Sequence, residues 1–316
     1  MEAVLSGVIT WFGSFGEGRG KPPQRPPAKP SPPQRPPAKP SPPQRQPEAE
    51  AEPPSQSDPP GAWTPRRIRL AATLWGEGFI GPGGEEEALR LSKPLGLQES
   101  HSLLNLGAGL GGAARAITNA WGTWVSGFEQ NADLAAAGEA LSKKAKIEKK
   151  AEIRPFDPAA PRFRPGYFHH ALVQEVLWTV EDKARLLEAV AAALKPRGQL
   201  VMTDLTLGDV PLSPEDETAR AWARLDRGPA HLAPAEHCNA LLSRKGFEVR
   251  IAEDVSARHM QQALAGWRGM VEVLKAERPT RAQALMIVQE AELWLRRLAL
   301  IRANRLRLMR WHAIRR

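Results

Sequence analysis

Cysteine is almost absent from this sequence, which excludes several kinds of site. Cys238 is the one cysteine in 316 residues, so the chain has no internal disulfide, no thiol zinc cluster and no redox pair. A chain without disulfides is typical of a reducing compartment, and we therefore expect the cytoplasm. Long hydrophobic runs are absent too. No stretch of 18 apolar residues exists to span a bilayer, which excludes a transmembrane protein.

Positive and negative side chains nearly balance over most of the chain, although the formal net charge is +9. Residues 1–65 carry seven Lys and Arg against six Asp and Glu, whereas residues 290–316 carry eight arginines against two glutamates. A basic face of this kind could contact nucleic acid or anionic lipid. No aromatic-interleaved recognition motif accompanies it, so we expect a solvated surface and no nucleic-acid partner.

Proline is concentrated at one end, where 18 of the 30 prolines fall between Pro22 and Pro65. The decapeptide PPQRPPAKPS occupies residues 22–31 and again 32–41. Such repeats favour polyproline II and cannot build a packed core. The composition predicts a short apolar segment at 1–20, a disordered Pro-rich linker at 21–65 and a folded domain at 66–316.

The first 15 residues are apolar but lack the basic start and the cleavage site of a secretory signal. Their large apolar side chains share one face of a helical pattern: Val4, Val8, Trp11, Phe12 and Phe15. This segment could contact a protein partner or a membrane surface. No basic residue precedes Arg19 to hold anionic lipid, so a disordered or weakly docked end is the alternative.

Short apolar runs alternate with amphipathic stretches after Ser100. The pattern predicts strands at 102–106, 124–128, 153–156, 169–174 and 199–203, and helices at 111–119, 132–144 and 182–194. Alternation of strand and helix calls for a parallel sheet covered on both faces. We therefore expect a doubly wound α/β fold.

A glycine-rich turn, Gly107-Ala-Gly109-Leu-Gly111-Gly112, lies between the first expected strand and helix. Glycine lets the backbone turn sharply and approach a ligand, while the helix end offers free amide groups. Glu129 follows 22 residues after Gly107, where a nucleotide-binding fold places a carboxylate on ribose hydroxyls. The turn also satisfies the dinucleotide pattern G-x-G-x-x-G, so on its own it leaves a dehydrogenase open.

Three runs in order resemble the class I S-adenosylmethionine-dependent methyltransferases of the small-molecule type. They are LLNLGAGLGGAARAI, VSGFEQN and HHALVQEVLWTVEDKARLLEAVAAALKPRGQLVMTDL, and the resemblance covers roughly residues 75–206. The Leu-Lys-Pro-x-Gly turn at 194–198 has no counterpart in the dehydrogenase pattern. The resemblance implies a seven-stranded Rossmann-like methyltransferase fold, with a helix at 234–245, a sixth strand at 247–252 and an antiparallel seventh strand at 305–314. At the sheet edge, that last strand would point arginines outward.

The same resemblance implies where S-adenosylmethionine binds. Gly107, Gly109 and Gly111 would line its methionine and ribose, and Glu129 would accept hydrogen bonds from both ribose hydroxyls. Gln130 would lie beside the adenine, Asp157 would meet the adenine amino group, and Gln174 completes the expected set. No metal is expected.

The run LWGEGFIGPGG at 74–84 resembles the segment that closes over cofactor and substrate in phosphoethanolamine and related amine N-methyltransferases. Three features depart from those enzymes. Trp178 stands in place of their catalytic histidine, Asn105 in place of an aspartate, and Tyr167, the one tyrosine, lies outside the segment. These departures argue against phosphoethanolamine itself and leave open a non-catalytic binding module.

Methyl transfer needs a nucleophile held near the methyl carbon. Glu175, at the end of the fourth expected strand, is our candidate to orient an amine or accept its proton. The resemblance implies that residues 207–232 form a substrate lid. The expected substrate-binding residues are Trp75, Phe79, Trp178, Trp222 and His231. We expect methylation of a small molecule, with an amine nitrogen favoured; an enzyme acting on lipid or RNA is the other alternative.

Overall fold

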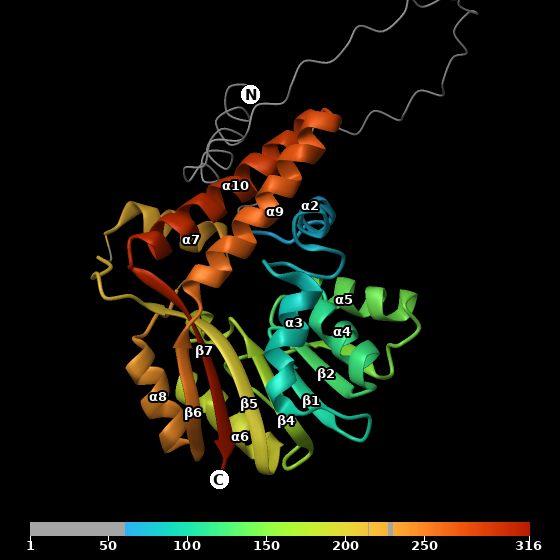
Figure 1. Ribbon diagram of the computed structural model, residues 1–316, viewed down its shortest axis with the longest axis vertical. Helices are drawn as coiled ribbons and strands as arrows, with labels where there is room; N and C mark the ends of the chain where they lie inside the picture. The colour runs from blue at the N-terminus through green and yellow to red at the C-terminus, as the bar shows by residue number, and fades with distance from the viewer. Residues whose placement is uncertain (1–60, 214, 227–229) are drawn as a thin grey trace, which may run out of the picture.

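The computed structural model describes residues 61–213, 215–226 and 230–316. The expected apolar segment at 1–20 and nearly all of the Pro-rich linker therefore lie outside the described residues. A central sheet carries helices on both faces, and a group of helices caps one end of the sheet (Figure 1). Within the described ranges, no helix combines the length and the apolar character needed to cross a bilayer.

The sheet has seven strands in the order β3-β2-β1-β4-β5-β7-β6. The first five strands pair in parallel, and β7 runs antiparallel to both of its neighbours. This confirms the doubly wound, seven-stranded methyltransferase fold. The strands are β1 Ser102–Leu106, β2 Trp124–Glu129, β3 Ala151–Pro155, β4 Phe168–Gln174, β5 Leu194–Leu207, β6 Phe247–Asp254 and β7 Leu306–Arg315.

Alternate residues of the strands feed two apolar layers. Leu104 and Leu106 of β1 pack with helices α6 (Lys183–Ala193) and α8 (Ala235–Arg244) on one face. Leu103 packs on the other face with α3 (Gly84–Ser92), α4 (Gly112–Trp121) and α5 (Ala132–Lys144). Burial on both sides explains why leucines of β1 occur on both faces of the strand.

A helical cap covers the carboxyl ends of the parallel strands (Figure 1). It consists of α2 (Pro65–Trp75), α7 (Glu217–Leu225), α9 (Ser256–Ala276) and α10 (Arg281–Arg302). The cap has its own apolar core, which includes Trp75, Trp222, Trp267 and Trp294. The expected lid contributes α7, whereas α9 and α10 are not among the elements expected from the sequence.

The C-terminal arginines correct two of the expectations. Strand β7 is not an edge strand, because it lies between β5 and β6. Arg297 and Arg310 are buried rather than solvated. Five of these arginines form ion pairs with carboxylates: Arg296 with Glu292, Arg297 with Glu175 and Asp226, Arg305 with Asp216, Arg307 with Asp209, and Arg310 with Glu253. Much of the C-terminal charge is therefore paired with carboxylates of the same chain, partly buried and partly at the surface.

Candidate active site

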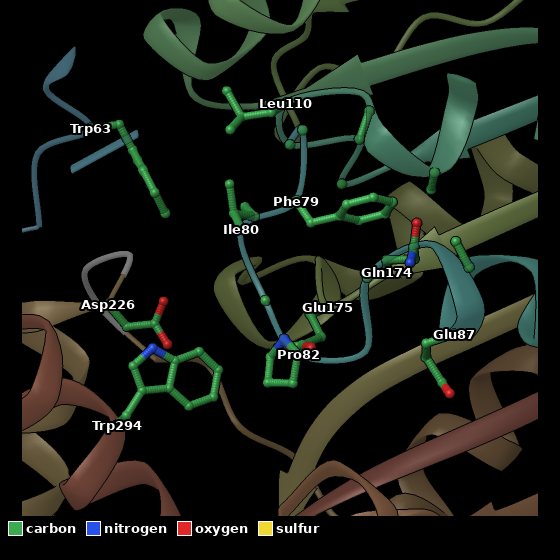
Figure 2. Close-up of a pocket in the computed structure, with 18 of the residues that line it drawn as sticks. Trp63, Phe79, Ile80, Pro82, Glu87, Leu110, Gln174, Glu175, Asp226 and Trp294 are labelled. Carbon is green, nitrogen blue, oxygen red and sulfur yellow. The ribbon is translucent and has the colours of Figure 1, made fainter. Parts of the chain in front are cut away.

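A cavity of about 110 Å³ lies between the carboxyl ends of β1 and β4 and the helical cap (Figure 2). The glycine turn, the end of β4, the loop at 78–82 and residues of α10 form its wall. The polar and aromatic lining residues are Trp63, Arg67, Phe79, Glu87, Gln174, Glu175, Asp226, Glu290, Trp294 and Arg297. Open α/β sheets bind ligands at this end of their strands.

The glycine turn leaves β1 through left-handed backbone that favours glycine. Gly107, Gly109 and Gly111 have φ of 70°, 54° and 77°. Gly107 and Gly109 line the cavity, while Gly111 is the N-cap of α4. A side chain on Gly107 would overlap the carbonyl oxygen of Gln174, so the ends of β1 and β4 approach each other only because this residue is glycine.

Glu129 lies at the end of β2, directly beneath the turn. Its side chain is buried, its Oε2 accepts a hydrogen bond from Gly109 N at 2.8 Å, and its Oε1 accepts one from Asn131 N at 3.0 Å. The structure thus brings together the turn and the carboxylate that sequence spacing paired. A carboxylate fixed in this way can accept further hydrogen bonds from ligand hydroxyls.

The other expected cofactor residues lie at different distances from the cavity. Gln174 lines it, and its Oε1 accepts a hydrogen bond from Asn105 Nδ2 at 3.3 Å. Gln130 accepts a hydrogen bond from Thr179 Oγ1 at 3.2 Å and is not in the lining. Asp157 is exposed after β3, where its side chain caps the local turn through Ala159 N at 2.8 Å.

Asn105 is fully buried in β1 and carries an unused acceptor. Its Nδ2 donates to Leu172 O and to Gln174 Oε1, both at 3.3 Å, but its Oδ1 has no partner among the described residues. An unsatisfied buried carbonyl costs about 1 to 3 kcal/mol. Asn105 itself does not line the cavity, whereas its hydrogen-bond partner Gln174 does. The turn and Glu129 fit the polar groups of S-adenosylmethionine.

Glu175 follows β4 with a strained backbone, since its φ of 52° is uncommon outside glycine. Its amide donates to Thr203 O at 2.7 Å, and its side chain lines the cavity. The carboxylate forms an ion pair with Arg297 of α10, a guanidinium that also lies 3.5 Å from Asp226 Oδ2. The expected catalytic carboxylate is therefore held by a buried cation that sequence reasoning missed.

Asp204 of β5 holds the backbone that follows Glu175. Its two oxygens accept hydrogen bonds from Leu177 N at 2.6 Å and Trp178 N at 3.0 Å. Complete burial, and to a smaller extent the charge of Glu175, raise the pKa of Asp204 to about 7 although these two amides oppose the shift. This residue fixes the turn that follows Glu175, and sequence reasoning did not find it.

Of the five expected substrate-binding residues, only Phe79 lines the cavity. Trp75, Trp178 and Trp222 are buried in the core of the cap instead. Trp178 stacks on Trp222 with ring centroids 5.1 Å apart, and its backbone amide donates a hydrogen bond to Asp204 Oδ1 at 3.0 Å. The amide of His231 donates to Trp178 O at 2.7 Å, outside the cavity lining.

The wall contains residues that sequence reasoning missed, above all Trp63, Glu290 and Trp294. Glu290, Trp294 and Arg297 are spaced at i, i+4 and i+7 on α10, which places them on one helix face. This helical spacing of polar and aromatic residues is the feature of the sequence from which a shared face could have been predicted. Among the described residues, no group of three or more His, Cys, Asp or Glu side chains is arranged to hold a metal ion.

A parallel sheet with an antiparallel seventh strand inserted between β5 and β6, and a glycine turn above a buried carboxylate, defines the class I methyltransferase fold. The methyltransferase domain family matches residues 84–251, which is just over half of the chain. The chain belongs to this family, and the class expected from the sequence is confirmed.

The relatives include phosphoethanolamine N-methyltransferase 2 of Caenorhabditis elegans, 29% identical over 132 residues, which cover 41% of this chain and 30% of the relative. The solved Haemonchus contortus phosphoethanolamine N-methyltransferase 2, in complex with S-adenosyl-L-methionine, has a TM-score of 0.66 at 22% identity and covers 78% of this chain and 56% of that one. This chain therefore spans less than two thirds of either protein.

The same fold serves other chemistry. Geranyl diphosphate C-methyltransferase of Streptomyces coelicolor has a TM-score of 0.56 at 16% identity, over 73% of this chain and 75% of that one. These structural likenesses show the fold alone. The choice of methyl acceptor has to come from the residues around the cavity.

Proposed function

We propose that this chain is an S-adenosylmethionine-dependent methyltransferase that methylates the nitrogen of a small-molecule amine. The observation that carries the proposal is one continuous cavity, in which the glycine turn above Glu129 meets a wall rich in carboxylates. The turn accounts for the cofactor, and Glu175 on the same wall is placed to orient an amine. The amine N-methyltransferases among the relatives agree with this choice.

The cofactor-binding part of the proposal uses residues already in place. Gly107 and Gly109 allow the cofactor to lie against the backbone, Glu129 accepts hydrogen bonds from its ribose, and Asn105 Oδ1 receives its ammonium group. When bound, the cofactor supplies a methyl group on a positively charged sulfur. Phe79, Ile80 and Leu110 form the apolar part of the wall and exclude water (Figure 2).

Glu175 is the proposed residue for orienting the amine. Its side chain lines the cavity beside its ion pair with Arg297, which places the carboxylate to accept a hydrogen bond from a substrate N–H. The carboxylate can take the proton that an ammonium must lose before its nitrogen can attack. The guanidinium of Arg297 holds the carboxylate in place, which favours a role in orienting the amine.

The two alternatives have less support. An enzyme acting on lipid or RNA was suggested by the C-terminal arginines, and the five named above are each paired with a carboxylate of this chain. A non-catalytic module was suggested by Asn105 and Trp178. Trp178 lies in the core outside the cavity lining, and Asn105 keeps a buried oxygen for a ligand.

The single cysteine supports the cytoplasm as the proposed compartment.

Calorimetric titration of the full chain with S-adenosylmethionine and its demethylated product tests the proposal. We expect both to bind, and Glu129→Ala to weaken binding by about tenfold or more, since hydrogen bonds to a charged group contribute roughly 1.5 to 3 kcal/mol. Glu99→Ala is the matched control, because that glutamate is exposed and pairs only with Lys150 in the described structure. Equal affinity of the parent and Glu129→Ala would overturn the site assignment.

A further inference from the structure

Glu175 needs support from its surroundings because its backbone is strained. Its φ of 52° lies in the left-handed region, and a residue with a side chain keeps such a conformation only where neighbouring groups fix it. The amides of Leu177 and Trp178, two and three residues further on, donate to separate oxygens of Asp204 at 2.6 and 3.0 Å. Asp204 is only 1% exposed, so water has little access to these bonds. One carboxylate of β5 therefore holds the backbone on the C-terminal side of Glu175.

The side chain of Glu175 is supported separately, by helices α10 and α7. Its carboxylate forms an ion pair with Arg297, and the same guanidinium lies 3.5 Å from Asp226 Oδ2 at the end of α7. That oxygen also accepts a hydrogen bond from Trp222 Nε1 at 3.2 Å. The side chains of Arg297 and Asp226 are 4% and 9% exposed, so this pair is held inside the cap. Glu175 is therefore linked to Trp222 through one guanidinium and one carboxylate.

The two supports meet at a pair of stacked indoles. Trp178 and Trp222 are both completely buried, and their ring centroids lie 5.1 Å apart with the planes 29° from parallel. Asp204 holds the backbone of Trp178, and Asp226 holds the indole N–H of Trp222. Because buried side chains are close-packed, a shift of one indole displaces the other. The contacts thus form a closed support circuit, which consists of Glu175, Arg297, Asp226, Trp222, Trp178 and Asp204.

We propose that Asp204 and Trp222 are positioning residues for methyl transfer, which hold the Glu175 carboxylate where it orients the substrate amine. This rests on the proposed function, in which Glu175 has that role. Neither Asp204 nor Trp222 lines the cavity, so each acts on the substrate through Glu175. Displacement of an orienting group by about 1 Å can lower a rate by about a hundredfold, so the support circuit affects kcat. The glycine turn and Glu129 lie outside the circuit, and cofactor affinity is therefore independent of it.

Two conservative variants test the two supports. Asp204→Asn keeps the shape of the side chain but replaces one accepting oxygen by an N–H donor that faces a backbone amide. Trp222→Phe keeps a ring for the stack but loses the hydrogen bond to Asp226. We expect kcat for the best amine to fall by about tenfold or more in Asp204→Asn and by about threefold or more in Trp222→Phe, with the affinity for S-adenosylmethionine within about twofold of the parent.

Trp311→Phe is the matched control for Trp222→Phe. Trp311 is also completely buried, and its Nε1 donates to a side-chain oxygen, Asn239 Oδ1, at 2.6 Å. Its hydrogen bonds within the described structure do not involve the support circuit. We expect kcat of Trp311→Phe to stay within about twofold of the parent, because loss of a buried hydrogen bond elsewhere leaves Glu175 in place.

The same variants in a Glu175→Gln background separate positioning from a general effect on the fold. A residue that acts through the carboxylate has little further effect once the carboxylate is removed, so we expect an additional fall in kcat of less than about twofold. An additional fall as large as that in the parent background would overturn the inference. Unchanged kcat in both single variants would also overturn it.

A second cycle measures the circuit without turnover. Asp204→Asn and Trp222→Phe act on opposite sides of one stack, so their effects on the unfolding equilibrium constant in urea should depart from a simple product by about threefold or more. Asp204→Asn combined with Thr280→Ala, at the other end of α10 from Arg297, should be multiplicative within about twofold. Multiplicative effects of Asp204→Asn and Trp222→Phe would overturn the inference. Absence of turnover with every amine would instead refute the proposed function, and with it the role in methyl transfer, whatever the unfolding cycle gives.

Discussion

Gly107 and Gly96 have similar backbone conformations in very different surroundings. Their φ values are 70° and 58°, but a Cβ on Gly107 would overlap Gln174 O, whereas one on Gly96 would have nothing within 4 Å. The backbone term is therefore common to both positions, about 1 kcal/mol for alanine in the left-handed region. Any further loss at Gly107 measures the close approach of β1 and β4.

We expect Gly96→Ala to lower the free energy of unfolding by about 1 kcal/mol and Gly107→Ala to lower it by several kcal/mol. Urea denaturation followed by circular dichroism measures both values. Gly107→Ala should also weaken cofactor binding, because relief of the overlap moves the turn. Similar losses in the two variants would show that the turn adapts to a side chain and does not depend on glycine at this position.

Glu175 and Glu188 provide a matched pair for the chemistry. Glu175→Gln keeps the shape of the side chain but removes the charge that can accept a proton, so turnover of the best amine should fall by roughly a hundredfold. Glu188→Gln, at an exposed residue paired with Lys245, should leave turnover unchanged. The turnover rates of the two variants are measured with labelled cofactor. Equal rates in the two variants would remove the role assigned to Glu175.

Residues that belong to one motif with a fixed spacing were predictable from the sequence. The turn at Gly107 and the carboxylate of Glu129 followed from a fixed spacing, and they meet at 2.8 Å. Arg297 and Trp63 were not, because each reaches the cavity through tertiary packing of a distant segment. Trp178 shows the opposite case: its sequence position indicated the cavity, but its ring packs in the core of the cap and its amide donates to Asp204.

At the scale of whole elements, α10 matters most because one of its faces carries Glu290, Trp294 and Arg297 to the cavity. The helix begins with a capping box, in which Thr280 Oγ1 accepts from Gln283 N at 3.3 Å and Gln283 Oε1 accepts from Thr280 N at 2.8 Å. Strand and helix alternation predicted the parallel half of the sheet. The insertion of β7 between β5 and β6 was missed, because strand order depends on long-range pairing that periodicity does not encode.

Thr280→Ala removes the cap of α10 and should lower the free energy of unfolding by about 1 kcal/mol. Thr73→Ala is the control, because the Thr73 hydroxyl only donates to Arg69 O within an exposed part of α2, and it should change stability by less than about 0.5 kcal/mol. Urea denaturation compares the two. A loss of the same size in both variants would mean that the cap does not contribute.

The stability of the whole molecule depends on which N-terminal residues belong to the folded domain. The expected start was residue 66, but Trp63 is buried and the side chain of Thr64 caps α2. We expect deletion of residues 1–60 to leave the melting temperature within about 5 °C of the full chain. Deletion of residues 1–66 removes the cap and the buried indole and should lower it by about 5 to 15 °C. Scanning calorimetry measures both, and equal melting temperatures would contradict the role of Trp63 in the fold.

Buried titratable groups give the molecule a pH dependence of predictable sign. Burial, with the charges of neighbouring histidines, lowers the pKa of His170 to about 4, and burial beside Arg297 lowers that of His259 to about 4. Unfolded histidine titrates near 6.5, so between pH 6.5 and 4 the unfolded chain binds more protons and stability falls with acidification. Asp204 has the opposite effect, because its pKa of about 7 lets the folded chain hold a proton that the unfolded chain releases near 4.

Two histidines therefore act against one aspartate. We expect the free energy of unfolding to fall by a few kcal/mol between pH 6.5 and 4.5, because each tenfold difference in proton affinity between the folded and unfolded chains contributes about 1.4 kcal/mol. His259→Phe removes one of the two histidines, so the remaining contributions of His170 and Asp204 nearly cancel. Urea denaturation of the parent and the variant at several pH values, each referred to its own stability at pH 8, measures the difference. A variant whose stability falls with acidification as steeply as that of the parent would show that His259 is not held neutral in the folded protein.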